Sequence, residues 1–169
     1  MTTLETERLR LRPFREEDFD MYAAFCADAE VMRYLSANGR PLSRNDAWRQ
    51  MATFIGHWQL RGYGIWAMEE KRSGKFIGRV GLWNPEGWPG LEVGWLLGRA
   101  WWGKGLATEG GRASIDYAAR VLGADHILSV IHPENVASIR VAEKLGSTLE
   151  RTAVINGVDV VIYGQRLHR

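Results

Sequence analysis

The sequence predicts an α+β fold in which a single domain spans residues 1–169. Three observations lead to this prediction: strand-like alternation in both halves of the chain, two amphipathic helical segments near its start, and one strand–turn–helix–strand unit after its middle. With 169 residues, 46% of them hydrophobic, one core of ordinary size can form. Neither a linker nor an internal repeat divides the chain.

The first part of the chain predicts a strand followed by two helices. Residues 3–14 alternate apolar side chains with arginines, as a strand does, and residues 15–27 predict a helix with acidic residues in its first turn. A second helix is expected to start near Ser43 and to end at Gly62. Its apolar face is expected to contain Ala47, Trp48, Met51, Phe54, Ile55 and Trp58.

The remaining elements are apolar runs separated by turn-forming residues. The turn Asn156-Gly157 between the last two strands is a strong signal for a two-residue hairpin. In chain order these elements are strands at 64–70, 75–83 and 90–97, a helix reaching about 122, a strand at 125–131, a helix at 136–145, and strands at 148–154 and 158–166.

Composition narrows the classes of function. A net charge of +2, with 25% charged residues, gives no strong field for nucleic acid or a membrane surface. No apolar run approaches the roughly 18 residues of a membrane span, and the polar start of the chain does not match a signal peptide. The single Cys26 excludes an internal disulfide and fits a reducing compartment. We therefore expect a cytoplasmic protein without nucleic-acid or membrane partners.

Residues 99–109 are the most informative stretch, because they join the apolar strand 91–97 to the start of an amphipathic helix. A helix N-terminus presents unpaired N–H groups that suit a phosphate. Gly103 and Gly105 let the backbone approach an anion closely, since they carry no Cβ. The stretch predicts a site for a phosphorylated cofactor.

Other interpretations of this glycine loop stay open. A P-loop requires Gly-x4-Gly-Lys-Ser/Thr, which Gly103-Lys104-Gly105 does not supply. A dinucleotide fingerprint requires a third glycine where this chain has Thr108, and would use Glu134 as its acidic ribose partner. A nucleotide-binding oxidoreductase is thus one alternative, and a glycine-rich turn without a ligand is another.

A second motif lies further along the chain, in residues 135–146 (Asn-Val-Ala-Ser-Ile-Arg-Val-Ala-Glu-Lys-Leu-Gly). Together with residues 102–109 (Trp-Gly-Lys-Gly-Leu-Ala-Thr-Glu), it resembles the GNAT N-acetyltransferases. The nearest branch resembles the ribosomal-protein alanine acetyltransferases (RimJ/RimL-like). The resemblance covers nearly the whole chain, from the opening 4–12 through the strand carrying Glu92-Val93-Gly94-Trp95.

The resemblance implies a GNAT fold. In this fold a mostly antiparallel central sheet splays between two parallel middle strands, here 91–97 and 125–131, and about four helices flank it. The gap between the two strands admits the pantetheine arm of acetyl-CoA, the implied co-substrate, and the glycine loop holds its pyrophosphate. The implied cofactor-binding residues are Trp95, Leu96, Leu97, Trp102, Gly103, Lys104, Gly105, Leu106, Ala107, Thr108, Asn135 and Ser138.

The chain departs from the family pattern at two positions. Trp102 stands where Gln or Arg usually opens the loop, and we interpret it as a mark of the RimJ/RimL-like branch. Ala142 stands seven residues after Asn135, where many family members carry a Tyr that protonates the leaving thiolate. That tyrosine mechanism therefore cannot be carried over to this chain.

Acetyl transfer to an amine requires a base for the amine and favours a proton donor for the thiolate. Glu92 is the candidate base, because burial in an apolar strand raises a carboxyl pKa; the alternative is an ion pair with Arg79. Ser138 is the candidate donor, one helical turn after Asn135; the alternative is an N-cap and a first-turn residue without a chemical role. Cys26 lies far in sequence from the cofactor motifs, which favours direct transfer.

Several polar residues receive supporting roles. Glu109 is expected to support the glycine loop electrostatically, and Arg140 and Lys144 either reach phosphates on the adenine side or are simply solvated. No metal site is predicted, since no histidine has a metal-ligand spacing or pairs with a nucleophile. The histidines are His57, expected as a helix-face residue, His126, His132 and His168.

The amine acceptor is the least specified part of the prediction. Five tryptophans are expected near the cleft, and three others fit core packing. The family fold implies an acceptor side made by the first two helices, their connection 33–42 and the late hairpin. The ordinary pKa of an α-amine is about 8 and that of a lysine about 10.4, so a weak base suffices only for the former. The tryptophans expected near the cleft are Trp83, Trp88, Trp95, Trp101 and Trp102, and those that fit core packing are Trp48, Trp58 and Trp66.

We thus expect an enzyme that moves an acetyl group from acetyl-CoA to a primary amine by direct attack in a ternary complex. The acceptor is a protein N-terminal α-amine or a small-molecule amine. The alternative is a non-catalytic acyl-CoA-binding or regulatory module, against which the presence of both Glu92 and Ser138 argues. A homodimer is plausible for the family, and no feature of the sequence specifies it.

Overall fold

The computed structural model describes residues 2–36 and 38–167, and an eight-stranded sheet forms its centre. The strand order is β1-β2-β3-β4-β5-β6-β8-β7, and only β5 and β6 are parallel neighbours among the described strands. The strands are β1 (Leu4–Glu5), β2 (Leu9–Arg12), β3 (Ile65–Glu70), β4 (Lys75–Trp83), β5 (Glu92–Leu97), β6 (His126–Ile131), β7 (Thr148–Ile155) and β8 (Val158–Arg166).

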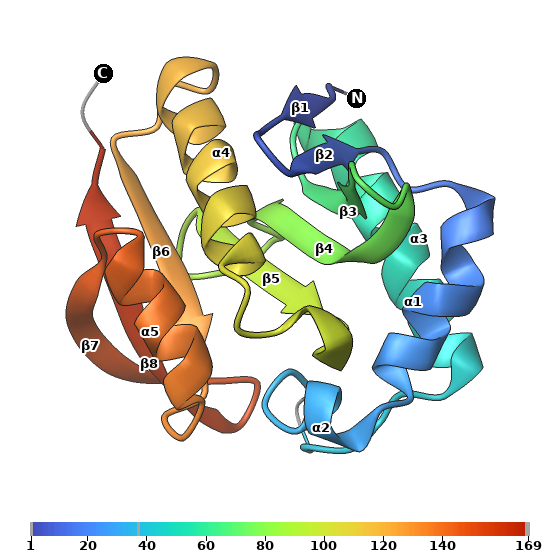
Figure 1. The fold of residues 1–169 in the computed structure, drawn as a ribbon. Coiled ribbons are helices and arrows are strands. Elements are labelled where there is room, and N and C mark those ends of the chain that lie inside the picture. The colour runs from blue at the N-terminus through green and yellow to red at the C-terminus, as the bar shows by residue number, and fades with distance from the viewer. Residues whose placement is uncertain (1, 37, 168–169) are drawn as a thin grey trace.

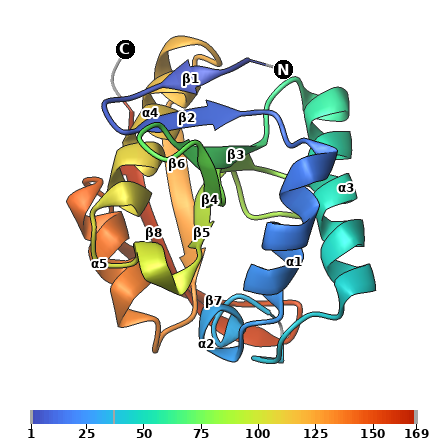
Figure 2. The ribbon, with the colours of Figure 1, turned by 45° about the vertical axis from the view of Figure 1, so that its right-hand side comes forward.

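Helices cover both faces of this sheet (Figures 1 and 2). Helices α4 and α5 lie on one face, α1 and α3 lie on the other, and the short α2 lies near the end where β5 stops. The helices are α1 (Phe19–Cys26), α2 (Ala29–Met32), α3 (Arg44–Arg61), α4 (Leu106–Arg120) and α5 (Val136–Lys144), with 3-10 turns η1 (Glu16–Asp18) and η2 (Arg99–Trp101). None of these described helices combines the length and the apolar character that crossing a bilayer requires.

Two apolar clusters hold the helices to the sheet. On the α4 face, Ile115 and Ala118 belong to a cluster with strand residues such as Val80. On the opposite face, Tyr22 of α1 and Phe54 of α3 belong to a second cluster with residues of β3, β4 and β5. Burying each large apolar side chain contributes roughly 1.5–3 kcal/mol to the stability of the fold. This packing therefore holds the helices in place on the two faces of the sheet.

The sheet opens between its two parallel strands, as the resemblance implies. In the described structure β5 and β6 pair only at Glu92 and Leu128, where the Leu128 N–H donates to the Leu91 carbonyl at 2.9 Å. Beyond this point side chains bridge the strands: the Ser129 hydroxyl donates to the Val93 carbonyl at 2.8 Å. The mixed α/β fold with a splayed sheet is thereby confirmed.

One prediction about the first part of the chain is wrong. The strand over 3–14 is a hairpin of β1 and β2, because Thr6 closes a turn: Leu9 N–H donates to Thr6 Oγ1 at 2.9 Å. The described residues contain five helices where about four were expected, and the additional one is α2, a single turn that the Asp28 side chain caps. Such a short helix has no periodicity that a sequence pattern can detect.

The apolar face of α3 is narrower than expected. Ala47, Met51, Phe54 and Trp58 are buried, whereas Trp48 is 56% exposed and Ile55 is 36% exposed. His57 is buried instead, where its ring stacks on Trp83. Trp48 is therefore not a core residue, while Trp58 and Trp66 pack in the core as predicted.

Candidate active site

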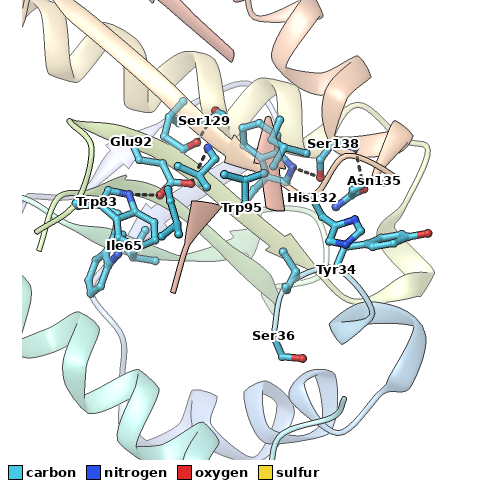
Figure 3. Close-up of a pocket in the computed structure, with 18 of the residues that line it drawn as sticks. Tyr34, Ser36, Ile65, Trp83, Glu92, Trp95, Ser129, His132, Asn135 and Ser138 are labelled. Atoms are coloured by element: carbon cyan, nitrogen blue, oxygen red, sulfur yellow. Dashed lines mark hydrogen bonds between the residues drawn. The ribbon is translucent and has the colours of Figure 1, made fainter. Parts of the chain in front are cut away.

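A cavity of about 440 Å³ lies where the sheet opens, and its walls come from several distant segments (Figure 3). Strands β5 and β6 form one side with Glu92 and Ser129. The connection after α2 contributes Tyr34, and the final hairpin contributes Asn156. Of the segments expected on the acceptor side, the second early helix, the connection 33–42 and the late hairpin line this cavity, whereas no residue of the first helix, expected over 15–27, does.

Glu92 is the buried acid of this cavity. Its Oε2 accepts a hydrogen bond from Trp88 Nε1 at 2.7 Å, and its Oε1 accepts one from the Val130 N–H at 3.3 Å. Burial raises the pKa of Glu92 to about 7, although both hydrogen bonds and the charge of Arg79 act in the opposite direction. No ion pair joins Glu92 to Arg79 among the described residues, although the charge of Arg79 acts on the pKa of Glu92. A carboxyl group of this pKa can accept a proton near neutral pH.

A second cavity, of about 430 Å³, lies on the α4 and α5 side of the opening. Eleven of the twelve predicted cofactor-binding residues line it. The exception is Lys104, whose Nζ lies 4.9 Å from the centre of the Trp101 ring. Arg140 and Lys144 also line this cavity. The eleven are Trp95, Leu96, Leu97, Trp102, Gly103, Gly105, Leu106, Ala107, Thr108, Asn135 and Ser138.

The glycine loop at the edge of the second cavity has the geometry of an anion site. Gly103 and Gly105 adopt φ values of 71° and 77°, which favour glycine. The first helical hydrogen bond of α4 runs from the Glu109 N–H to the Gly105 carbonyl at 3.0 Å. The N–H groups before Glu109 have no helical acceptor, and together with the helix dipole they favour a bound anion.

Glu109 supports this loop through contacts with the N-terminal hairpin. Its carboxylate accepts hydrogen bonds from Thr6 Oγ1 at 2.6 Å and from Arg8 N and Nε at 2.8 and 2.6 Å. Arg8 Nη1 also donates to the Lys104 carbonyl at 2.9 Å. Burial raises the pKa of Glu109, but the bonds from Thr6 and Arg8 outweigh it and the net pKa is lowered. The arginine partner was not predicted, because 101 positions separate it from Glu109.

The two cavities meet at residues that line both, including Trp95, Asn135 and Ser138. Trp95 Nε1 donates to Ser138 Oγ at 3.3 Å, and the Ser138 N–H donates to Asn135 Oδ1 at 3.1 Å. Figure 3 shows Trp95 between Glu92 and Ser138. Asn135 therefore is the N-cap of α5, which is the alternative role that the sequence left open for it. The Ser138 hydroxyl oxygen accepts a hydrogen bond from Trp95, and among the described residues no acceptor is present for the hydroxyl hydrogen.

The structure adds cavity residues that the sequence did not single out. Tyr34 and His132 face each other with ring centres 5.0 Å apart, and both line the first cavity. Trp88 was expected near the cleft, but its bond to Glu92 was not predicted. Trp101 and Trp102 line only the second cavity. Cys26 is buried in the core between the helices, where burial raises its thiol pKa.

The remaining histidines do not gather into a metal site. His126 contacts Glu150 at 2.6 Å on the surface, and His57 lies on the buried face of α3. Within residues 2–36 and 38–167, no group of three His, Cys, Asp or Glu side chains is arranged to hold a metal ion. His168 lies outside the described residues.

Comparison with known proteins assigns this fold to an acyltransferase enzyme. The sequence profile of the acetyltransferase (GNAT) domain matches residues 8–148, so the chain belongs to the GNAT acetyltransferase family. It is 34% identical to an uncharacterized N-acetyltransferase, p20, of Bacillus licheniformis, over 86% of this chain and 82% of the relative.

Solved structures agree on the fold. The crystal structure of an acetyltransferase from Agrobacterium tumefaciens matches with a TM-score of 0.88 and 30% identity, over 100% of this chain and 95% of that one. RimL, a ribosomal L7/L12 α-N-protein acetyltransferase in complex with coenzyme A, matches with a TM-score of 0.80 over 98% of each chain. At 19% identity, the similarity to RimL shows the fold alone.

Proposed function

We propose that this protein is an N-acetyltransferase that moves the acetyl group of acetyl-CoA to a primary amine by direct attack. Acetyl-CoA occupies the second cavity, and the amine occupies the first. The acceptor is a protein N-terminal α-amine or a small-molecule amine, and the RimJ/RimL-like branch and a homodimer remain predictions. The single buried Cys26 makes the reducing cytoplasm the compartment that we propose.

One observation carries this proposal: a buried carboxyl with a pKa of about 7 lies in a cavity that joins the glycine-loop cavity at Ser138. An amine and a thioester bound in the two cavities would meet at this junction. Holding two reactants in this way makes a bimolecular step effectively unimolecular, which lowers the barrier to direct acyl transfer.

The steps follow from the positions of these groups. An ammonium group in the first cavity transfers one proton to the carboxylate of Glu92, and the free amine nitrogen attacks the thioester carbonyl carbon. The new C–N bond forms, the C–S bond breaks, and the thiolate takes up the second proton of the nitrogen. In this proposal the Ser138 hydroxyl donates a hydrogen bond to the sulfur while this occurs, which the position of Ser138 in the lining of the second cavity supports.

The test combines binding with turnover. Calorimetry measures the affinity for acetyl-CoA, a free-thiol assay measures CoA release with a panel of small amines and N-terminal peptides, and mass spectrometry identifies the acetylated product. Amine-dependent thiol release together with an acetylated amine supports the proposal. Acetyl-CoA binding without acceleration by any amine would favour the non-catalytic acyl-CoA-binding module instead.

A further inference from the structure

Arg79 of β4 lies in the wall of the acceptor cavity without an acidic partner. Its Nε is the single buried side-chain nitrogen or oxygen atom that lacks a hydrogen-bond partner in the described part of the chain. No ion pair involving Arg79 is present among the described residues. A buried donor without an acceptor costs free energy, so such an atom calls for an explanation.

Among the described residues, the guanidinium of Arg79 is flanked by an aromatic ring and by a hydroxyl and a thiol group, and no carboxylate lies within ion-pair distance of it. The guanidinium carbon lies 4.8 Å from the centre of the Phe54 ring. The nearby phenol of Tyr22 and thiol of Cys26 are buried, and burial raises the pKa of both groups, so they are neutral at pH 7. Glu92 is the acid whose pKa the Arg79 charge lowers, and this is the smallest of the effects on that pKa.

Arg12 of β2 is a fully buried arginine in the same fold and serves structure alone, whereas Arg79 is only partly buried. Arg12 donates to both oxygens of Asp18 at 2.7 Å and to Glu69 at 2.7 Å. Its charge is thus matched by two carboxylates within the protein. Among the described residues, Arg79 has no such carboxylate, so a carboxylate brought by a ligand could serve as its partner.

Arg79 and Glu92 contribute to one cavity from adjacent strands. Arg79 pairs with Leu96 of β5, four positions along the strand from Glu92. Four positions correspond to about 13 Å between backbone sites, and both residues line the first cavity. Gly94 lies in that stretch of β5, and an ideal Cβ built on it would lie 3.6 Å from Glu92 Oε1. A small molecule with two charged groups could therefore contact both side chains.

We propose that the acceptor is a small amine that also carries a carboxylate, with Arg79 binding the carboxylate while Glu92 accepts the proton of the amine. This inference rests on the proposed function and narrows its substrate class. A guanidinium forms its strongest hydrogen bonds with carboxylates, in a paired geometry that a neutral amide cannot reproduce. The first residue of a protein chain presents an amide at that position, so the pairing favours a free amino acid over a protein N-terminus.

The test compares amines that differ only in this group. The twenty proteinogenic L-amino acids, their amides, and N-terminal peptides are assayed by acetyl-CoA-dependent thiol release and by calorimetry on the CoA-loaded protein. We expect at least one amino acid to exceed its own amide by at least about 10-fold in kcat/KM. In Arg79→Gln this preference should fall below about 3-fold, while acetyl-CoA affinity stays unchanged and Arg79→Lys keeps part of the preference. Arg49→Gln, which removes an exposed arginine outside both cavities, is the matched control.

Several results would overturn the inference. They are amides or peptides that react as well as the amino acids, a preference that survives in Arg79→Gln, or no binding of any amino acid. Each of these, with amine acetylation intact, leaves the proposed function standing. Carboxylate-dependent binding that requires Arg79 but yields no acetylated product would support the carboxylate site at Arg79 and defeat both the proposed function and the role of the ligand as acceptor. If Arg79→Gln does not fold, as judged by circular dichroism, Arg79→Lys decides.

Discussion

Replacing Glu92 by glutamine removes a buried carboxyl group and keeps its shape, so the substitution isolates the effect of its charge. Burial raises the pKa of this group from an ordinary 4.5 to about 7. Since one pH unit corresponds to about 1.4 kcal/mol, keeping Glu92 ionised in the folded protein costs about 3 kcal/mol. The glutamine oxygen can accept a hydrogen bond from only one of the two donors, Trp88 and Val130. The lost hydrogen bond lowers the unfolding free energy of the variant by about 1 kcal/mol at any pH.

The direction in which stability changes with pH follows from the ionisation of Glu92 in the folded and in the unfolded chain. Below pH 4.5 Glu92 is protonated in the folded and the unfolded protein, so its burial carries no ionisation cost. Between pH 4.5 and 7 the unfolded chain releases the proton and the folded protein retains it, and stability is progressively lost as the pH rises. Above pH 7 the full cost remains. Glu92→Gln should therefore gain about 3 kcal/mol over the wild type between pH 4 and pH 8.

Urea unfolding of both proteins at pH values from 4 to 8 measures this difference, because every other titrating group is shared and cancels. The same buried group predicts that kcat/KM of the wild type rises with a midpoint near pH 7. In the variant that midpoint should vanish and the rate should fall about 100-fold. A difference in unfolding free energy that stays constant with pH would show that Glu92 titrates normally and would refute the reasoning.

Three further substitutions test individual contacts. Trp88→Phe removes a hydrogen bond to the ionised form of Glu92, so the midpoint of the pH–rate profile should move up by about one unit; an unchanged or lower midpoint would contradict this. Ser138→Ala should lower kcat about 10-fold while calorimetry shows the acetyl-CoA Kd within about 3-fold; a large loss of affinity at constant kcat would instead assign Ser138 to binding. Glu109→Gln should lower the unfolding free energy at pH 7 by about 1–3 kcal/mol. Because the folded pKa of Glu109 is lowered, this difference should shrink as the pH falls into the acid range, and urea unfolding with no such trend would refute it.

The parts of the fold that could be predicted are those with local signals. Strand β4 has the predicted bounds, because an apolar run lies between two clear turns. The hairpin turn was predictable because Asn156 and Gly157 tolerate the positive φ values of 52° and 78° that they adopt. The turn that Thr6 makes between β1 and β2 gave no comparable signal, since it depends on one hydroxyl and on pairing with β3.

In the candidate site, the burial of a side chain was easier to predict than its hydrogen-bond and ion-pair partners. Glu92 lies within an apolar strand, and this is enough to predict a raised pKa. Its hydrogen bond to Trp88 depends on the course of the loop before β5, which no local pattern specifies. The contact between Arg8 and Glu109 and the missing acceptor for Arg79 Nε depend on where the strands are placed in the sheet. Such contacts follow from the tertiary fold and appear only with the structure.

The measurement that tests the central claim most directly is calorimetric binding of acetyl-CoA to the wild-type protein and to Gly105→Trp. Gly105 has a φ of 77° at the start of α4 and lines the second cavity, so a tryptophan there both strains the loop and fills the anion site. We predict micromolar binding by the wild type and its loss in a folded Gly105→Trp variant. Equal affinity in both proteins, or no binding by the folded wild type, would contradict the assignment of acetyl-CoA to this cavity.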